Sequence, residues 1–226
     1  MIKVNILATG STGNCVILND AVMVDCGVSF KLVSSYLDKV KLVLITHEHQ
    51  DHFLPSTIRR MATEKPLLRF GCGPWMVKKL LATGVKKSQI NVLYDKMLQP
   101  YNLCSVLPVP VFHDVQNYAY KIFFPNKEKV FYCTDMGHLN GVNARGYDLY
   151  LVENNYKEDE LQARMDAKLA EGKYPYEMRV RRYHMSEEQI TNWLYANMDQ
   201  QKSEYIFLHK HVDRGATRYE GVDSGL

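Results

Sequence analysis

The segment from Thr46 to His52, which reads Thr-His-Glu-His-Gln-Asp-His, constrains the fold of this chain more than any other feature. Three imidazoles and one carboxylate lie close together in it, at His47, His49, Asp51 and His52. Residue frequencies give such a pattern by chance in roughly one chain in two thousand. Imidazole and carboxylate suit zinc, manganese or iron, and one short loop can turn several of them toward one point. We therefore predict a metal site rather than the alternative, a solvated polar loop.

One loop cannot supply every ligand of a two-metal site, so further ligands are expected at the ends of other strands. His113, Asp135 and His209 each directly follow an apolar run that reads as a strand. A strand end is rigid enough to hold a ligand in place. Each residue alone is equally compatible with an ordinary polar position, but together they extend the predicted site. His211 is the alternative to His209, which we favour because it directly follows the strand.

The rest of the pattern predicts alternating strands and helices. Apolar segments bounded by turn residues predict strands at 2–8, 15–18, 21–25, 41–45, 147–152 and 205–208, and a β-rich region over 103–133. Helices are predicted over 29–37 with Ser29 as the cap, from Pro55, from Pro74 to a Gly84 stop, over 158–171, and after a Ser186 capping box. This order suggests two sheets that pack face to face and are covered by helices.

Composition narrows the class of protein. The chain has 226 residues, of which 46% are hydrophobic and 23% charged, so we expect one globular domain over 1–226 and no membrane association. A net charge of +3 is too mild to indicate nucleic-acid binding by itself. Five cysteines without a CxxC pair, and an N-terminus without a signal-peptide pattern, predict reduced thiols in a soluble cytoplasmic protein.

Taken together, the motif and the three strand-end residues resemble the metallo-β-lactamase fold hydrolases along nearly the whole chain. The resemblance implies an α+β single domain, a four-layer αββα sandwich with the site at one edge of the sheets. It implies that one metal is bound by His47, His49 and His113, and the second by Asp51, His52 and His209, with Asp135 bridging them. The two divalent ions would be Zn²⁺ or Mn²⁺, between which the ligand set does not choose.

Three further segments bear on the substrate, because lactamases, thioesterases, lactonases and nucleases share this site. Ser11-Thr-Gly-Asn14 resembles the loop of small bacterial and phage nucleases or phosphohydrolases, although a plain tight turn explains it equally well. Glu153-Asn154-Asn155 resembles a stretch in the same group. Tyr183-His184-Met185-Ser186 resembles the His-x-Ser element of tRNA 3′-processing nucleases of the ribonuclease Z type. In those enzymes that histidine meets the phosphate opposite the metals and donates a proton.

A physical argument supports the same role for His184. It directly precedes a helix capped by Ser186, where free backbone N–H groups attract an anion. Basic side chains lie just upstream, although a solvated loop face accounts for them equally well. The predicted substrate-binding residues are Ser11, Asn14, Asn154, Arg182 and Ser186. The chain also departs from these nucleases: Tyr156 stands where they carry a histidine, and Lys210-His-Val-Asp follows the last ligand in place of Leu-Ser.

The resulting prediction is a dinuclear metal-dependent phosphodiesterase. Metal-bound hydroxide would attack the phosphorus, Asp51 or Asp135 would orient it, and His184 would protonate the leaving oxygen. The substrate would be nucleic acid or a small nucleotide, including a cyclic one. The chain is short for an inserted nucleic-acid-gripping domain, and the sequence reveals no aromatic platform. The alternatives are a thioester or lactone hydrolase at the same site and a non-catalytic, metal-stabilised binding protein. The resemblance also makes a homodimer a candidate assembly.

Overall fold

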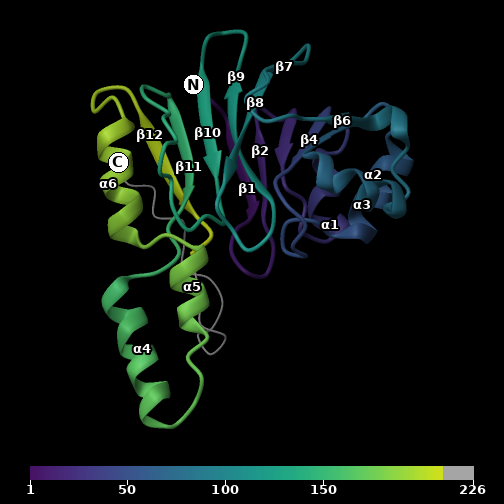
Figure 1. Cartoon of the computed structure of the whole chain (residues 1–226). Helices are drawn as coiled ribbons and strands as arrows, with labels where there is room; N and C mark the ends of the chain where they lie inside the picture. The colour runs from purple at the N-terminus through teal and green to yellow at the C-terminus, as the bar shows by residue number, and fades with distance from the viewer. Residues whose placement is uncertain (211–226) are drawn as a thin grey trace.

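The computed structural model describes residues 1–210, which contain two six-stranded sheets (Figure 1). The first sheet has the order β1-β2-β3-β4-β5-β6. Its strands are β1 (Val4–Ala8), β2 (Cys15–Leu18), β3 (Val22–Val24), β4 (Leu42–Ile45), β5 (Arg69–Cys72) and β6 (Ile90–Val92). The first three strands pair antiparallel, and β3 to β6 pair parallel.

The second sheet has the order β12-β11-β10-β9-β8-β7. Its strands are β7 (Gln99–Pro100), β8 (Ser105–Val111), β9 (Asn117–Phe123), β10 (Lys129–Cys133), β11 (Leu149–Glu153) and β12 (Glu204–Leu208). Strands β10, β11 and β12 run parallel, so their carboxyl ends lie at the same edge. The register pairs Cys133 with Val152 and Glu153 with Leu208, which brings the residues after each strand close together.

Strand alternation divides the apolar residues between two faces of each sheet. In β4, Leu42 and Leu44 point into the core between the sheets, whereas Val43 and Ile45 pack under the helices outside. Tyr120 and Tyr132 are buried on the facing side of the second sheet. Because each sheet buries both faces, strands such as β4 are continuous apolar runs rather than alternating ones.

The helices complete a four-layer αββα sandwich, as predicted. The first sheet is covered by α1 (Phe30–Val33), α2 (Pro55–Glu64) and α3 (Val77–Thr83), with 3-10 turns at η1 (Ser34–Tyr36), η2 (Pro74–Met76) and η3 (Lys87–Gln89). The second sheet is covered by α6 (Glu187–Asn197). Two further helices, α4 (Glu158–Ala170) and α5 (Glu177–Tyr183), project away from the sheets as a hairpin (Figure 1). The described residues form a single α+β domain.

Most predicted elements are present, and the capping signals are confirmed in part. Gly84 ends α3 with a left-handed φ of 99°, and Ser186 caps α6 in a capping box with Gln189. The Ser29 prediction is half wrong, because the residue holds the cap position but its side chain makes no capping hydrogen bond. The helix predicted there is one α-helical turn followed by a 3-10 turn. The five cysteines are free and buried, as expected.

Candidate functional site

The metal-ligand motif lies in the loop that follows β4, and this loop packs closely on the turn after β3. Asn14 N–H donates to Asp51 O at 2.6 Å, and Cys26 N–H donates to His52 O at 2.9 Å. A Cβ atom at Gly27 would lie 1.8 Å from Asp51 O, so only glycine permits this approach. The loop is therefore held from two sides, which fixes the direction of its imidazoles.

A first group of ligand-type atoms comes from both sheets. His47 and His49 follow β4, and His113 follows β8. One ring nitrogen from each residue lies within 4.8 Å of the others. The His49 Nδ1 atom is 3.1 Å from His47 Nε2 and 3.4 Å from His113 Nε2. Three imidazole nitrogens that face one another at such distances are suited to share a divalent ion.

A second group adjoins the first. Asp51 Oδ2 is 3.4 Å from His52 Nε2 and 3.4 Å from His209 Nε2. His52 is fully buried and His209 nearly so. His209 follows β12, so this group also combines the two sheets. His211, the alternative to His209, lies outside the described residues.

Asp135 lies between the two groups. Its Oδ2 is 2.8 Å from His52 Nε2, and its Oδ1 is 3.4 Å from His209 Nε2 and 3.9 Å from His113 Nε2. Asp135 and His209 both have left-handed backbones, with φ of 58° and 52°. Such φ values are uncommon for residues other than glycine and cluster at functional sites. The structure thus brings together all the side chains that were predicted as metal ligands.

The Nδ1 atoms of three of these imidazoles face away from the centre and have hydrogen-bond partners, which orient the Nε2 atoms toward it. His52 Nδ1 is 2.7 Å from Asp25 Oδ2, His47 Nδ1 is 2.9 Å from Thr46 Oγ1, and His113 Nδ1 is 3.1 Å from the Tyr183 carbonyl oxygen. A histidine that donates from Nδ1 presents the Nε2 lone pair, and such outer partners are typical of metal sites.

Asp25 is a site residue that the sequence analysis missed. It is fully buried after β3, with a φ of 60°, and it accepts hydrogen bonds from Thr46 N–H at 2.8 Å and Thr46 Oγ1 at 2.9 Å. The signal was present, because Asp25 is a ligand-type residue at the end of an apolar strand, like His113.

The electrostatics of the centre favour a cation. Burial alone would raise the pKa of Asp135, but His209 and His52 outweigh it and hold that pKa well below its usual range. Burial and the neighbouring His52 charge lower the pKa of His47 well below its ordinary value. Asp135 Oδ2 is buried and, although it lies 2.8 Å from His52 Nε2, it makes no hydrogen bond of suitable geometry within residues 1–210. An ionised carboxylate among several imidazoles, without thiolates, fits a divalent metal ion.

His184 lies outside these two groups, but it forms a further cluster of ligand-type atoms with Asp135, Glu153 and His209, all within 4.8 Å of one another. Its Nδ1 is 3.2 Å from Glu153 Oε2 and 3.3 Å from Asn155 Nδ2, and its ring stacks on that of His209 at 5.6 Å. Burial lowers the pKa of His184, but the charge and hydrogen bond of Glu153 outweigh burial and raise that pKa to about 9. Glu153 also accepts from the backbone N–H groups of Asp135 and Met185. It therefore joins His184 to the backbone of the central aspartate.

The carboxyl end of α5 packs directly against the turn that carries Asp135. A Cβ atom at Gly137 would lie 2.3 Å from the Arg182 carbonyl oxygen, so glycine is needed for this contact. Asp114 Oδ1 is 3.0 Å from His113 Nε2, and its other oxygen forms an ion pair with Arg179 of α5. Asp114 was also missed by the sequence analysis, and it connects the projecting helices to the site.

The predicted substrate-binding residues occupy different environments. Ser11 and Arg182 are exposed. Asn14 is buried, and its side-chain amide is 3.2 Å from Asp51 Oδ2 and 2.9 Å from His52 Nε2, which suits orientation of ligands. Asn154 is buried, and it is the neighbouring Asn155 that contacts His184 and His209. Ser186 uses its hydroxyl in the cap of α6. A substrate role for these residues stays a prediction.

Comparison with known proteins identifies the family. The profile of the beta-lactamase superfamily domain matches residues 20–209. A protein of Bacillus anthracis named exodeoxyribonuclease YycJ is 24% identical over 191 residues, which cover 78% of this chain and 69% of that protein. Within residues 1–210, no helix is long and apolar enough to cross a membrane.

Two solved structures share the fold. YhfI of Bacillus subtilis, described as a metallo-beta-lactamase fold protein, superposes with a TM-score of 0.69 and 15% identity over 94% of this chain and 87% of its own. The short form of human tRNase Z superposes with a TM-score of 0.68 and 13% identity over 94% and 93%. At these identities the likeness supports the fold alone.

Proposed function

The chain belongs to the beta-lactamase superfamily, and on that basis we propose that it is a metal-dependent phosphodiesterase that cleaves DNA. The observation that carries the proposal is His184, held by Glu153 beside the two ligand groups. A protonated imidazole next to a metal centre is suited to a leaving alkoxide, which needs a proton. The relative named exodeoxyribonuclease supports DNA as the substrate.

Two divalent ions fit the ligand groups. His47, His49 and His113 would hold one ion, Asp51, His52 and His209 the other, and Asp135 reaches both. When bound, such a pair lowers the pKa of water and neutralises charge on phosphoryl oxygens. Zn²⁺ and Mn²⁺ both suit imidazole and carboxylate.

The chain's own residues do the rest of the chemistry. Asp51 and Asp135 orient the attacking oxygen from the floor of the site. Because His184 Nδ1 faces Glu153, its Nε2–H is left to protonate the departing oxygen. Glu153 balances the charge of the imidazolium, and general acid catalysis of this kind contributes about 10²- to 10⁴-fold. The protein would act in the cytoplasm, where reduced buried thiols are expected.

The environment of His184 also separates the proposal from the thioester or lactone alternative. Acyl transfer at the same centre has no need of a general acid fixed at this position. The contact of Glu153 with His184 would then have no role in the reaction, although Glu153 would still hold the backbone of Asp135. A purely binding protein would have no use for the proton donor either.

The test is hydrolysis of a DNA oligonucleotide and of bis(p-nitrophenyl) phosphate by Zn²⁺- or Mn²⁺-loaded protein. The His184→Ala variant should lose about 10²- to 10⁴-fold on DNA while it retains its bound metal. His138→Ala is the matched control, because His138 is exposed and stacks on Phe112 outside the ligand groups. Metal-loaded protein without phosphodiesterase activity, or His184→Ala with full activity, would refute the proposal.

A further inference from the structure

His49 turns a different ring nitrogen toward the first ligand group from the one that its neighbours use. The Nδ1 atom of His49 lies 3.1 Å from His47 Nε2 and 3.4 Å from His113 Nε2, so Nδ1 is its ligand atom. The nitrogen that faces away from the group is therefore Nε2 in His49, whereas it is Nδ1 in His47 and His113. A neutral imidazole that binds an ion through Nδ1 has to carry its proton on Nε2. His49 thus needs an anionic or accepting group beside Nε2.

Asp114 supplies a carboxylate at that position. Its Oδ1 is 3.4 Å from His49 Nε2 and 3.0 Å from His113 Nε2. The same oxygen is buried, and within residues 1–210 it makes no hydrogen bond of suitable geometry. A buried carboxylate oxygen of this kind is costly unless a proton or a cation compensates its charge. Both are close by, as the proton of His49 Nε2 and as the ion that the first ligand group would hold.

The other oxygen of Asp114 is held by helix α5. Asp114 Oδ2 forms an ion pair with Arg179, whose side chain is 67% exposed. The sequence left the basic residues before His184 equally compatible with a solvated loop, but residues 177–183 are helical and the charge of Arg179 is paired. An ion pair at one oxygen orients the carboxylate, so Oδ1 is left facing the imidazoles.

Helix α5 reaches the first ligand group by a second contact. The Tyr183 carbonyl oxygen is 3.1 Å from His113 Nδ1, the nitrogen of that residue that faces away from the group. Two of the three imidazoles of the first group are therefore supported by α5, one directly and one through Asp114. In the second group, His52 has a different partner, because its Nδ1 faces Asp25.

From this arrangement we infer that Asp114 is a positioning residue for His49 and that Arg179 of α5 holds Asp114 in place. The carboxylate keeps the proton of His49 on Nε2, so Nδ1 offers its lone pair to the first ion. Helix α5 therefore sets the metal affinity of the first ligand group. The inference rests on the metal centre of the proposed function but not on its substrate.

The test is titration of chelator-treated protein with Zn²⁺ in competition with a chromophoric chelator. In Asp114→Asn, Arg179 attracts the amide oxygen, so the amide N–H₂ faces His49 Nε2. The proton of His49 then moves to Nδ1, where the ion needs a lone pair. Loss of such a partner typically weakens metal binding about 10- to 100-fold, and we expect this factor in one of the two binding events.

A double variant tests the role of Arg179. In the Arg179→Ala background, the amide that Asp114→Asn introduces can turn its oxygen toward His49 Nε2. Asp114→Asn should therefore cost at least about twofold less affinity in this background than in wild type. Arg179→Ala alone should weaken the same binding event by no more than about fivefold, and Arg179→Lys should restore it. A cost of Asp114→Asn that is equal in both backgrounds would overturn the role of Arg179.

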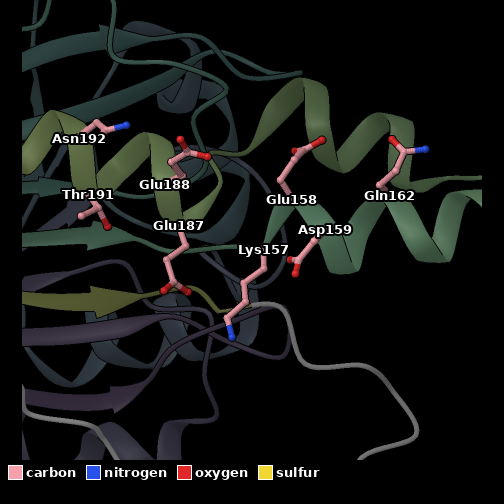
Figure 2. A pocket seen from close by; sticks show the side chains of 8 residues that line it. All are labelled: Lys157, Glu158, Asp159, Gln162, Glu187, Glu188, Thr191 and Asn192. Carbon is pink, nitrogen blue, oxygen red and sulfur yellow. The ribbon is translucent and has the colours of Figure 1, made fainter.

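Glu158 provides a matched control. It pairs with Arg181 at 2.5 Å, so Glu158→Gln also removes the carboxylate partner of an arginine on α5. Figure 2 shows Glu158 and Gln162, both partners of Arg181, in a pocket between the amino-terminal parts of α4 and α6. Among the described residues, Glu158 belongs to none of the ligand groups. Both Zn²⁺ constants of Glu158→Gln should equal those of the wild type.

The proton of His49 can also be observed directly. Long-range proton–nitrogen correlation NMR of the Zn²⁺-free protein, with His49→Gln for assignment, distinguishes Nε2–H from Nδ1–H. Wild type and Glu158→Gln should carry the proton on Nε2, and Asp114→Asn should carry it on Nδ1. A residue that only supports the loop would change stability but not the tautomer. Either an unchanged tautomer or two unchanged Zn²⁺ constants in Asp114→Asn would overturn the inference.

The outcomes separate this inference from the proposed function. Protein that shows the expected loss of Zn²⁺ affinity in Asp114→Asn, but hydrolyses no phosphodiester as wild type, refutes the proposed function alone. Wild-type protein that cleaves DNA, with an Asp114→Asn variant unchanged in tautomer and Zn²⁺ affinity, refutes the role of Asp114 alone.

Discussion

Replacement of Asp25 by asparagine should weaken the binding of a metal ion in the predicted ligand group that contains His52. In one orientation, the new amide keeps its oxygen on Thr46 and directs its N–H₂ at His52 Nδ1. His52 must then carry its proton on Nε2, where the metal needs a lone pair. In the other orientation, the amide N–H₂ faces the Thr46 N–H and leaves a buried donor unsatisfied, at about 1–3 kcal/mol. The amide adopts the orientation with the smaller free-energy cost, and that cost sets the decrease in metal affinity, about 5- to 150-fold.

The assay is titration of chelator-treated protein with Zn²⁺ in competition with a chromophoric chelator. Wild-type protein should show two binding events, and Asp25→Asn should weaken one of them by the stated factor. Asp148→Asn is the control, because Asp148 is a carboxylate that accepts from the backbone N–H of Lys129 in the second sheet and is not a ligand candidate. Two unchanged binding constants in Asp25→Asn would refute the reasoning about the tautomer of His52.

Three further predictions follow from the geometry. Gly137→Ala should displace α5 from the turn that carries Asp135. We expect kcat on DNA to fall more than metal affinity does, and the free energy of unfolding to fall by about 1–3 kcal/mol. A variant with the same kcat as the wild type would refute the importance of the contact with Arg182. Burial raises the pKa of Glu177, but the hydrogen bond and charge of Lys168 outweigh burial, so the pKa in the folded protein is lowered. The stabilisation by this ion pair is therefore present above the pKa of the unfolded chain, about 4.3, and is lost as pH falls through the lower pKa of the folded protein. The melting difference between wild type and Glu177→Gln should therefore vanish in acid. Chelation should abolish turnover and lower the melting temperature, and Zn²⁺ should restore both; a chelator-resistant activity would contradict a metal role.

The proximity of the predicted ligands could be worked out from sequence because every one lies in a short loop or at the end of an apolar strand. Parallel pairing of β10, β11 and β12 places their carboxyl ends at one edge, which brings Asp135, Glu153 and His209 together. The same rule applies to β3, and it would have found Asp25. Proximity is what the structure shows, whereas the assignment of ligands to two ions stays a prediction.

Other elements had no sequence signal strong enough to predict them. Strands β5 to β7 are two to four residues long and mix polar with apolar residues, so neither alternation nor an apolar run marks them. Helix α5 has seven residues, which is less than two full helical turns. A helix this short does not show a periodic apolar stripe in the sequence. Its helical form depends on tertiary contacts with α4 and with the turn at Gly137, which no local pattern encodes.

The division of the site between the two sheets has a consequence for how metal binding and folding are linked. The loop after β4 supplies His47, His49, Asp51 and His52, while the second sheet supplies His113, Asp135 and His209. Each ligand group contains members from both sheets, so neither sheet alone can form either group. An ion in either group would therefore cross-link the two halves across the core between the sheets. Metal affinity then includes the free energy of docking the sheets, and the buried core that docks them sets the ligand distances before any ion arrives.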